Sequence, residues 1–161
     1  MMRYARVWSL TLVVGLVTGF GGGAVSAQGA DAMNGTWTLN VAKSTFSPGP
    51  APQSQTLKLG GTDAARTIVV DLTPATGAAV HWEVSGGDGV ELPVVGNNAN
   101  ADTYVLERVN ATTIEAQYIK DGKPTIKQTA VVSADGKTLT VTGTGTDVQG
   151  RTVNNVAVYD K

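Results

Sequence analysis

The stretch TTIEAQYIKDGKPTIKQTAVVSADGKTLTVTG, residues 112–143, decides the fold. It holds two Asp-Gly-Lys sequences, at 121–123 and 135–137, and Asp-Gly pairs favour tight turns because both residues tolerate positive φ. Beside these turns apolar and polar residues alternate, as at Ile114 and Ala116. Alternation with a period of two is typical of strands with one buried face. We therefore predict three antiparallel strands here, over residues 112–120, 125–133 and 138–143.

The same pattern of short strand-forming segments and turns continues on both sides of this stretch. Short β-forming segments recur between turns rich in Gly, Pro and Asn, and no segment has the length and period of a helix. The further strands that we expect cover residues 35–41, 54–59, 66–72, 79–85, 90–95, 102–109 and 151–159. Connections this short join antiparallel neighbours, since parallel neighbours need long crossovers. The sequence predicts an all-β fold, an antiparallel up-and-down barrel of about ten strands, with a β-sandwich as the alternative.

Prolines mark two places where this pattern is interrupted. The sequence SPGPAP at residues 47–52 requires an extended loop, because each proline lacks an N–H donor and restrains the residue before it. Only a single helical turn fits between this loop and the first strand. Pro93, within the expected strand 90–95, indicates an edge or a bulge.

The first 27 residues have the three-part layout of a secretory signal peptide. Arg3 and Arg6 precede an apolar core, residues 7–20, and small residues at 25–27 offer a cleavage site. A membrane anchor is the alternative, but the core is shorter than the ~20 residues of a spanning helix. We expect a periplasmic or secreted protein. Its mature chain would begin with a flexible segment, residues 28–34, followed by one barrel domain, residues 35–161.

Composition excludes several function classes. The chain has no cysteine, so disulfides, thiolate catalysis, cysteine metal sites and a lipid-modified cysteine are all ruled out. Its net charge is only −1, and the charges are scattered without a basic stripe or a basic amphipathic helix. We expect no nucleic-acid partner, no membrane anchor after signal cleavage, no cofactor and a monomeric state.

Strand phase indicates which side chains face the interior. It places five candidates for ligand contact on faces shared with apolar neighbours: Trp82, Tyr104, Arg108, Tyr118 and Gln128. A polar group on such a face must be paired or must face a wet cavity. For Arg108 and Gln128 the alternative is a position at the barrel end, in contact with solvent. Asn155, in phase with Tyr159, is open to the same two interpretations.

Catalytic and metal chemistry has little support in the sequence. His81 and Glu83 share a strand face and could supply two metal ligands, but no third ligand is identifiable and no other histidine exists. A catalytic base at His81 would need a nucleophile and an orienting acid, whereas the aspartates lie mainly in turns. We therefore expect neither a metal site nor an enzyme.

The two ends of the strand pattern resemble those of the calycins, which include lipocalins and fatty-acid-binding proteins. The resemblance rests on Gly35-Thr36-Trp37 in the first strand, the ten-strand meander and the terminal Tyr159-Asp160-Lys161. Residues 34–46 are similar to exported bacterial proteins of the lipocalin-like type. The resemblance implies a barrel with an interior ligand site and a packing role for Trp37. Ala157 stands where fatty-acid-binding proteins place an arginine that meets a carboxylate, and no helix pair follows the first strand.

These observations favour an exported, lipocalin-like barrel that binds a small, largely apolar molecule in its interior. The alternative is a structural or protein-interaction β-domain with a filled core. An interior cavity of ~300 Å³ or more would separate the first function from the second.

Overall fold

The computed structural model describes residues 31–161, which form a single antiparallel sheet of eleven strands. The strands are β1 (Gly35–Leu39), β2 (Ser54–Thr62), β3 (Ala65–Thr73), β4 (Val80–Gly86), β5 (Leu92–Pro93), β6 (Val95–Gly96), β7 (Thr103–Asn110), β8 (Thr113–Lys120), β9 (Lys123–Val132), β10 (Thr138–Thr146) and β11 (Thr152–Asp160). The only helical element among the described residues is the 3₁₀ turn η1 (Val41–Lys43). This part of the chain contains no helix long and apolar enough to cross a membrane. The all-β antiparallel prediction is confirmed, whereas the expected signal peptide, residues 1–27, lies outside the described residues.

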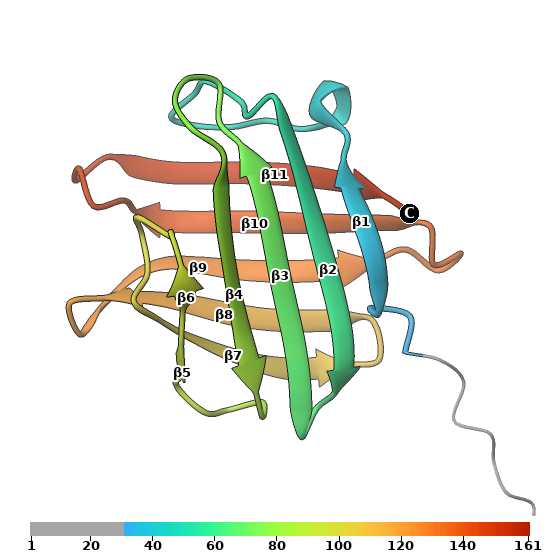
Figure 1. Cartoon of the computed structure of the whole chain (residues 1–161). Helices are drawn as coiled ribbons and strands as arrows, with labels where there is room; N and C mark the ends of the chain where they lie inside the picture. Colours follow the sequence, from blue (N-terminus) through green and yellow to red (C-terminus); the bar gives the residue numbers. More distant parts are fainter. Residues whose placement is uncertain (1–30) are drawn as a thin grey trace, which may run out of the picture.

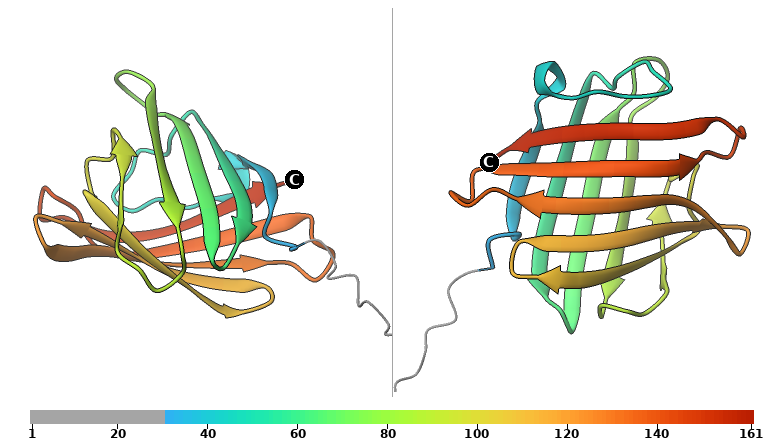
Figure 2. Two further views of the ribbon diagram at one scale, coloured as in Figure 1. Left: turned by 60° about the horizontal axis from the view of Figure 1, so that its bottom comes forward. Right: turned by 180° about the vertical axis from the view of Figure 1, so that it is seen from behind.

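The sheet curls until its two edges almost meet. Its strand order is β5-β7-β8-β9-β10-β11-β1-β2-β3-β4-β6, so β5 and β6 form the two edges. Only Val94 separates these edge strands in the sequence. In Figure 1, β1 to β4 cross in front of β7 to β11 at a steep angle, and the turned views in Figure 2 show the curl. The result is a nearly closed barrel.

The expected strand 90–95 is two strands, and this corrects the prediction. Leu92 pairs with Tyr104 of β7, whereas Gly96 pairs with Trp82 of β4. Pro93 has no N–H to donate, so the segment cannot sustain one continuous ladder and instead joins one edge of the sheet to the other. The edge position predicted for Pro93 is confirmed, and the division raises the strand number to eleven.

Both Asp-Gly turns are hairpin turns, as predicted. Asp121 and Gly122 have φ of 50° and 70°, which is the doubly positive pattern of the tight turn between β8 and β9. Gly136, with φ of 69°, lies in the connection between β9 and β10. These local turns explain why neighbouring strands in the sequence are also neighbours in the sheet.

The core collects the inward-facing apolar side chains of the strands. Trp37, on β1, is fully buried, and its Nε1 donates a hydrogen bond to the Met33 carbonyl oxygen at 2.9 Å. The Lys161 ammonium lies 4.7 Å from the centre of the Trp37 ring. β1 pairs with β2 on one side and with β11 on the other, so the beginning and the end of the barrel lie side by side.

Candidate functional site

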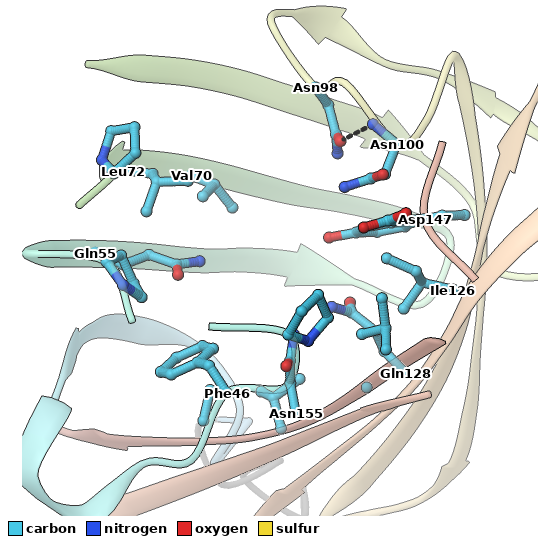
Figure 3. A pocket seen from close by; sticks show the side chains of 18 of the residues that line it. Phe46, Gln55, Val70, Leu72, Asn98, Asn100, Ile126, Gln128, Asp147 and Asn155 are labelled. Atoms are coloured by element: carbon cyan, nitrogen blue, oxygen red, sulfur yellow. Dashed lines mark hydrogen bonds between the residues drawn. The ribbon is translucent and has the colours of Figure 1, made fainter. Parts of the chain in front are cut away.

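A cavity of about 430 Å³ opens at the end of the barrel where β3 ends. Its mouth is formed by the proline-rich segment 46–52, the loop 97–100 and the turn 147–151. Its walls are side chains of the strands: Gln55, Val70, Leu72, Trp82, Tyr118, Ile126, Gln128, Val141, Val153, Asn155, Ala157 and Tyr159. Figure 3 labels several of them, among them Gln55, Gln128 and Asn155. The space exists partly because Gly143 and Ala157 have little or no side chain there.

A smaller chamber of about 60 Å³ continues inward from this cavity. Trp82, Tyr118, Gln128 and Tyr159 line both spaces. The residues that line only the chamber are apolar or aromatic: Met33, Leu57, Leu59, Ile68, Tyr104, Ile114, Ala116 and Ala130. The interior therefore becomes more apolar with depth.

Three aromatic side chains form one cluster at the junction of the two spaces. The ring centroids of Trp82 and Tyr118 are 6.0 Å apart in an edge-to-face arrangement. Tyr104 lies 5.2 Å from Tyr118 and 6.2 Å from Trp82, with tilted rings. These distances and tilts are those of favourable aromatic pairs. The cluster gives the cavity a fixed apolar wall.

Burial keeps the phenols at this site neutral. It raises the pKa of Tyr118 to about 12, although hydrogen bonds with Gln128 and Asn98 act in the opposite direction. Burial, together with the nearby Tyr118 and Tyr159 phenols, raises the pKa of Tyr104 well above its ordinary value. Burial also raises the pKa of Tyr159. All three tyrosines therefore stay neutral in alkaline solution in which an exposed tyrosine would ionise.

Five side-chain amides line the cavity, those of Gln55, Asn98, Asn100, Gln128 and Asn155. Asn98 Oδ1 accepts a hydrogen bond from the Asn100 backbone N–H at 3.0 Å, which Figure 3 marks. Asn100 Oδ1 accepts from the Val148 N–H at 3.3 Å and so joins two loops of the mouth. Asn155 Oδ1 accepts from the Ser47 N–H at 2.9 Å and holds the proline-rich segment.

The two charged residues at the cavity neutralise each other. Arg151 Nε lies 2.7 Å from Asp147 Oδ2, and the Asp147 side chain is only 4% exposed. Burial acts to raise the pKa of Asp147, but hydrogen bonds from the Arg151 backbone and guanidinium outweigh it, so the pKa lies below its usual value. Among the described residues that line the cavity, no other charged side chain is present.

The structure brings four of the five predicted site residues together. Trp82, Tyr118 and Gln128 line the cavity, and Tyr104 lines the inner chamber. Asn155, for which the sequence left two interpretations, also lines the cavity. The fifth residue, Arg108, lies elsewhere.

Arg108 belongs to an ionic cluster at the opposite end of the barrel, where β3 begins. Its Nε lies 2.7 Å from Asp63 Oδ1, and its Nη2 bonds to Asp31. The fully buried Arg66 joins the same cluster, with its Nε 3.1 Å from Asp88 Oδ1. The hydrogen bond from Arg108 lowers the pKa of Asp63. Arg108 therefore lies at the end of the barrel, which is the second of the two interpretations that strand phase allowed. Carboxylates from distant loops pair with it there.

His81 faces the outer surface of the barrel. Its Nδ1 lies 2.7 Å from Asp71 Oδ1, and the His81 side chain is 57% exposed. The hydrogen bond with His81 lowers the pKa of Asp71. Residues 31–161 contain no group of three or more His, Cys, Asp or Glu side chains arranged to hold a metal ion.

A second recess, of about 670 Å³, is lined by the loop 97–102 and by residues of the neighbouring strands. Leu72, Trp82, Asn98 and Asn100 border both this recess and the main cavity. Lys120 and Asp102 lie on its outer rim and form an ion pair. The loop therefore borders both spaces.

Sequence reasoning missed the loop residues of the site. Asn98 and Asn100 lie in a connection, where strand phase gives no direction. Phe46 and Asp147 also come from connections that lie far from the aromatic cluster in sequence. The prolines of 47–52 predicted an extended loop, but not that this loop forms part of the mouth of the cavity.

Comparisons of the chain with family models, curated proteins and solved structures found no match.

Proposed function

We propose that this protein binds a small, largely apolar molecule inside its barrel, as a lipocalin-like carrier or receptor would. The observation that carries the proposal is the cavity of about 430 Å³, which falls in the size range of small-molecule sites. It combines an aromatic wall with a few polar groups, and this combination is typical of ligand pockets. A space of this size and lining supports ligand binding over the alternative of a β-domain with a filled core.

The proposal is for binding without catalysis. The single histidine of the chain lies on the outer surface, paired with Asp71, and not at the cavity. The buried tyrosines are neutral, and Asp147 is already engaged by Arg151. None of these groups has the activated state that nucleophilic or acid–base chemistry requires.

Direct binding of a neutral fluorophore tests the proposal. N-phenyl-1-naphthylamine, whose emission rises in apolar surroundings, is expected to bind with a stoichiometry of one per chain. In the Ala157→Phe variant a phenyl ring occupies the cavity, so we expect binding to be lost. Val156 is the neighbouring residue on the outer face of β11, and the Val156→Phe variant should bind like the unmodified protein.

Circular dichroism and thermal melting of both variants establish that they are folded. Equal fluorophore binding by the Ala157→Phe and Val156→Phe proteins would contradict an interior site. If only the Ala157→Phe variant loses binding, mass spectrometry under native conditions, on protein purified from its own host, should identify the natural ligand as a co-purified mass.

We also propose export, with cleavage near Ala27 and Gln28. This proposal rests on the charged, apolar and small-residue regions of residues 1–27. Fractionation of expressing cells, followed by N-terminal sequencing, tests it. A chain that begins near Gln28 in the periplasm or the medium is expected, whereas an intact N-terminus in the cytoplasm would contradict export.

A further inference from the structure

Two asparagines at the cavity have a fixed orientation. The Oδ1 atoms of Asn100 and Asn155 each face a backbone N–H, that of Val148 and that of Ser47 respectively. A backbone N–H can only donate, so the amide atom that faces it must be the oxygen. Each Nδ2 therefore faces away from its backbone partner and remains a donor at the cavity that the backbone contact does not use.

The cavity also disfavours a charged ligand group. Ala157 places only a methyl group at the wall, and the one guanidinium at the mouth, that of Arg151, is paired with Asp147. Asp147 Oδ1 already accepts from two backbone N–H groups, those of Gln149 and Arg151. A carboxylate would lose its hydration without gaining a cation, and an ammonium group would find the Asp147 oxygens already occupied.

From these two features we propose that the bound molecule presents a neutral hydrogen-bond acceptor, such as an amide or ester carbonyl, to Asn100 and Asn155. This inference rests on the proposed binding function and adds the chemical class of the ligand. The ester or amide oxygen accepts from one or both Nδ2 groups at the mouth. The apolar body lies against Trp82 and Tyr118 and extends toward the inner chamber.

Four ligands with one ten-carbon chain separate the possible head groups. They are decanamide, methyl decanoate, decanoate and decylammonium, each titrated against protein loaded with N-phenyl-1-naphthylamine. The fluorophore has no carbonyl group, so its own binding reports the cavity alone. We expect the amide and the ester to displace it at concentrations roughly tenfold lower than the two ions.

The Asn155→Asp variant isolates the Nδ2 donor. An aspartate keeps the oxygen that accepts from Ser47, so the proline-rich segment stays held, but it replaces the donor with an acceptor. Methyl decanoate should then bind roughly fivefold more weakly, and decylammonium more tightly. Asn154, exposed and next in sequence on the opposite face of β11, provides the matched Asn154→Asp control. The control carries the same added charge and should leave the order of the four ligands unchanged.

The results distinguish the inference from the function on which it rests. If the fluorophore does not bind to the unmodified protein, the proposed function fails, and the inference fails with it. If the fluorophore binds but decanoate displaces it as well as the ester does, only the inference is overturned. Equal ester affinity in the Asn155→Asp and Asn154→Asp variants would likewise overturn only the inference.

Discussion

Arg66 carries a positive charge at a place where water does not reach. Its side chain is 0% exposed, and it contacts the carboxylates of Asp63 and Asp88 with Asp31 a little farther away. A buried charge is stable only while its partners remain, and the partners in turn depend on it. The residue therefore holds together the end of the barrel opposite the cavity.

Replacement of this arginine should be among the most damaging single changes in the protein. For Arg66→Met we expect the free energy of unfolding to fall by about 3 kcal/mol, because Asp88 loses its ionic partner. Urea denaturation followed by circular dichroism measures the change. As a comparison, Lys43→Ala removes an exposed ion pair with Asp160 and should cost less than about 1 kcal/mol. Equal effects of the two substitutions would contradict a structural role for the buried cluster.

The tyrosines at the cavity should resist ionisation. The folded-state pKa of Tyr118 is raised to about 12, above the ordinary value of 10.0, so its contribution to stability is full below pH 10.0 and is lost as the pH rises toward 12. We expect Tyr104, Tyr118 and Tyr159 to form phenolate only as the protein unfolds in alkali. Phenolate absorbance and circular dichroism, recorded on the same sample, should change together. Ionisation near pH 10.0 with an intact fold would contradict their burial.

The strands between 112 and 146 show what a local pattern can determine. The two Asp-Gly turns and the alternation of Ile114, Ala116 and Tyr118 predicted β8, β9 and β10 and the faces that they bury. Strand phase also predicted that Trp82 and Tyr118 face the same interior, because Trp82 lies in the regular β3–β4 ladder and Tyr118 in the regular part of the β7–β8 ladder. Local information suffices where each strand pairs with its neighbour in sequence.

The same reasoning fails where contacts come from distant parts of the chain. Nothing near Arg108 in sequence indicates Asp31 or Asp63, and β7 is irregular between Arg108 and Asn110. Loop residues such as Asn100 have no strand phase from which a direction could be derived. Their positions depend on closure of the whole sheet, which a pattern of a few residues cannot express.

Gly96 allows the backbones of β4 and β6 to approach each other closely. Its φ is 102°, and a Cβ atom there would lie 2.3 Å from the His81 carbonyl oxygen. For Gly96→Ala we expect a loss of roughly 2 kcal/mol or more, with faster hydrogen exchange at Asn97, whose N–H donates to His81. Gly89, with φ of 75° and no atom within 4 Å of its added Cβ, is the control. Gly89→Ala should cost only the backbone strain, and an equal loss in both variants would contradict the close approach.

Acid should loosen the turn between β10 and β11. The pKa of Asp147 lies below the ordinary value of 3.8, so its contribution to stability is present above that value and is lost as the pH falls through the lowered pKa. The amide signals of Gln149 and Arg151, which donate to Asp147, should shift in NMR spectra with a midpoint below pH 3.8. In Asp147→Asn the shifts should disappear. A midpoint above 3.8 would contradict the lowered pKa.

At the scale of the whole molecule, near-closure leaves only short strands at the two edges of the sheet. The edge strands β5 and β6 are two residues long each and lie next to each other in sequence. Short, adjoining edges protect a sheet against edge-to-edge association. We therefore expect a monomer whose melting temperature does not change with protein concentration. A melting temperature that rises with concentration would reveal association.

The pairing of β1 with β11 has a consequence for the order in which the chain can fold. β1 is synthesised before the other strands of the barrel. Its residues Thr38 and Leu39 can pair with β11 only after Asp160 and Tyr159 have been synthesised. Hairpins such as β8–β9 can form during synthesis, whereas this pairing must close a loop of nearly the whole domain. A chain that leaves the ribosome or crosses a membrane N-terminus first therefore stays an open sheet until its last strand emerges. Chaperones that bind exposed strands would be able to keep the chain unfolded throughout the time between the emergence of β1 and the emergence of β11.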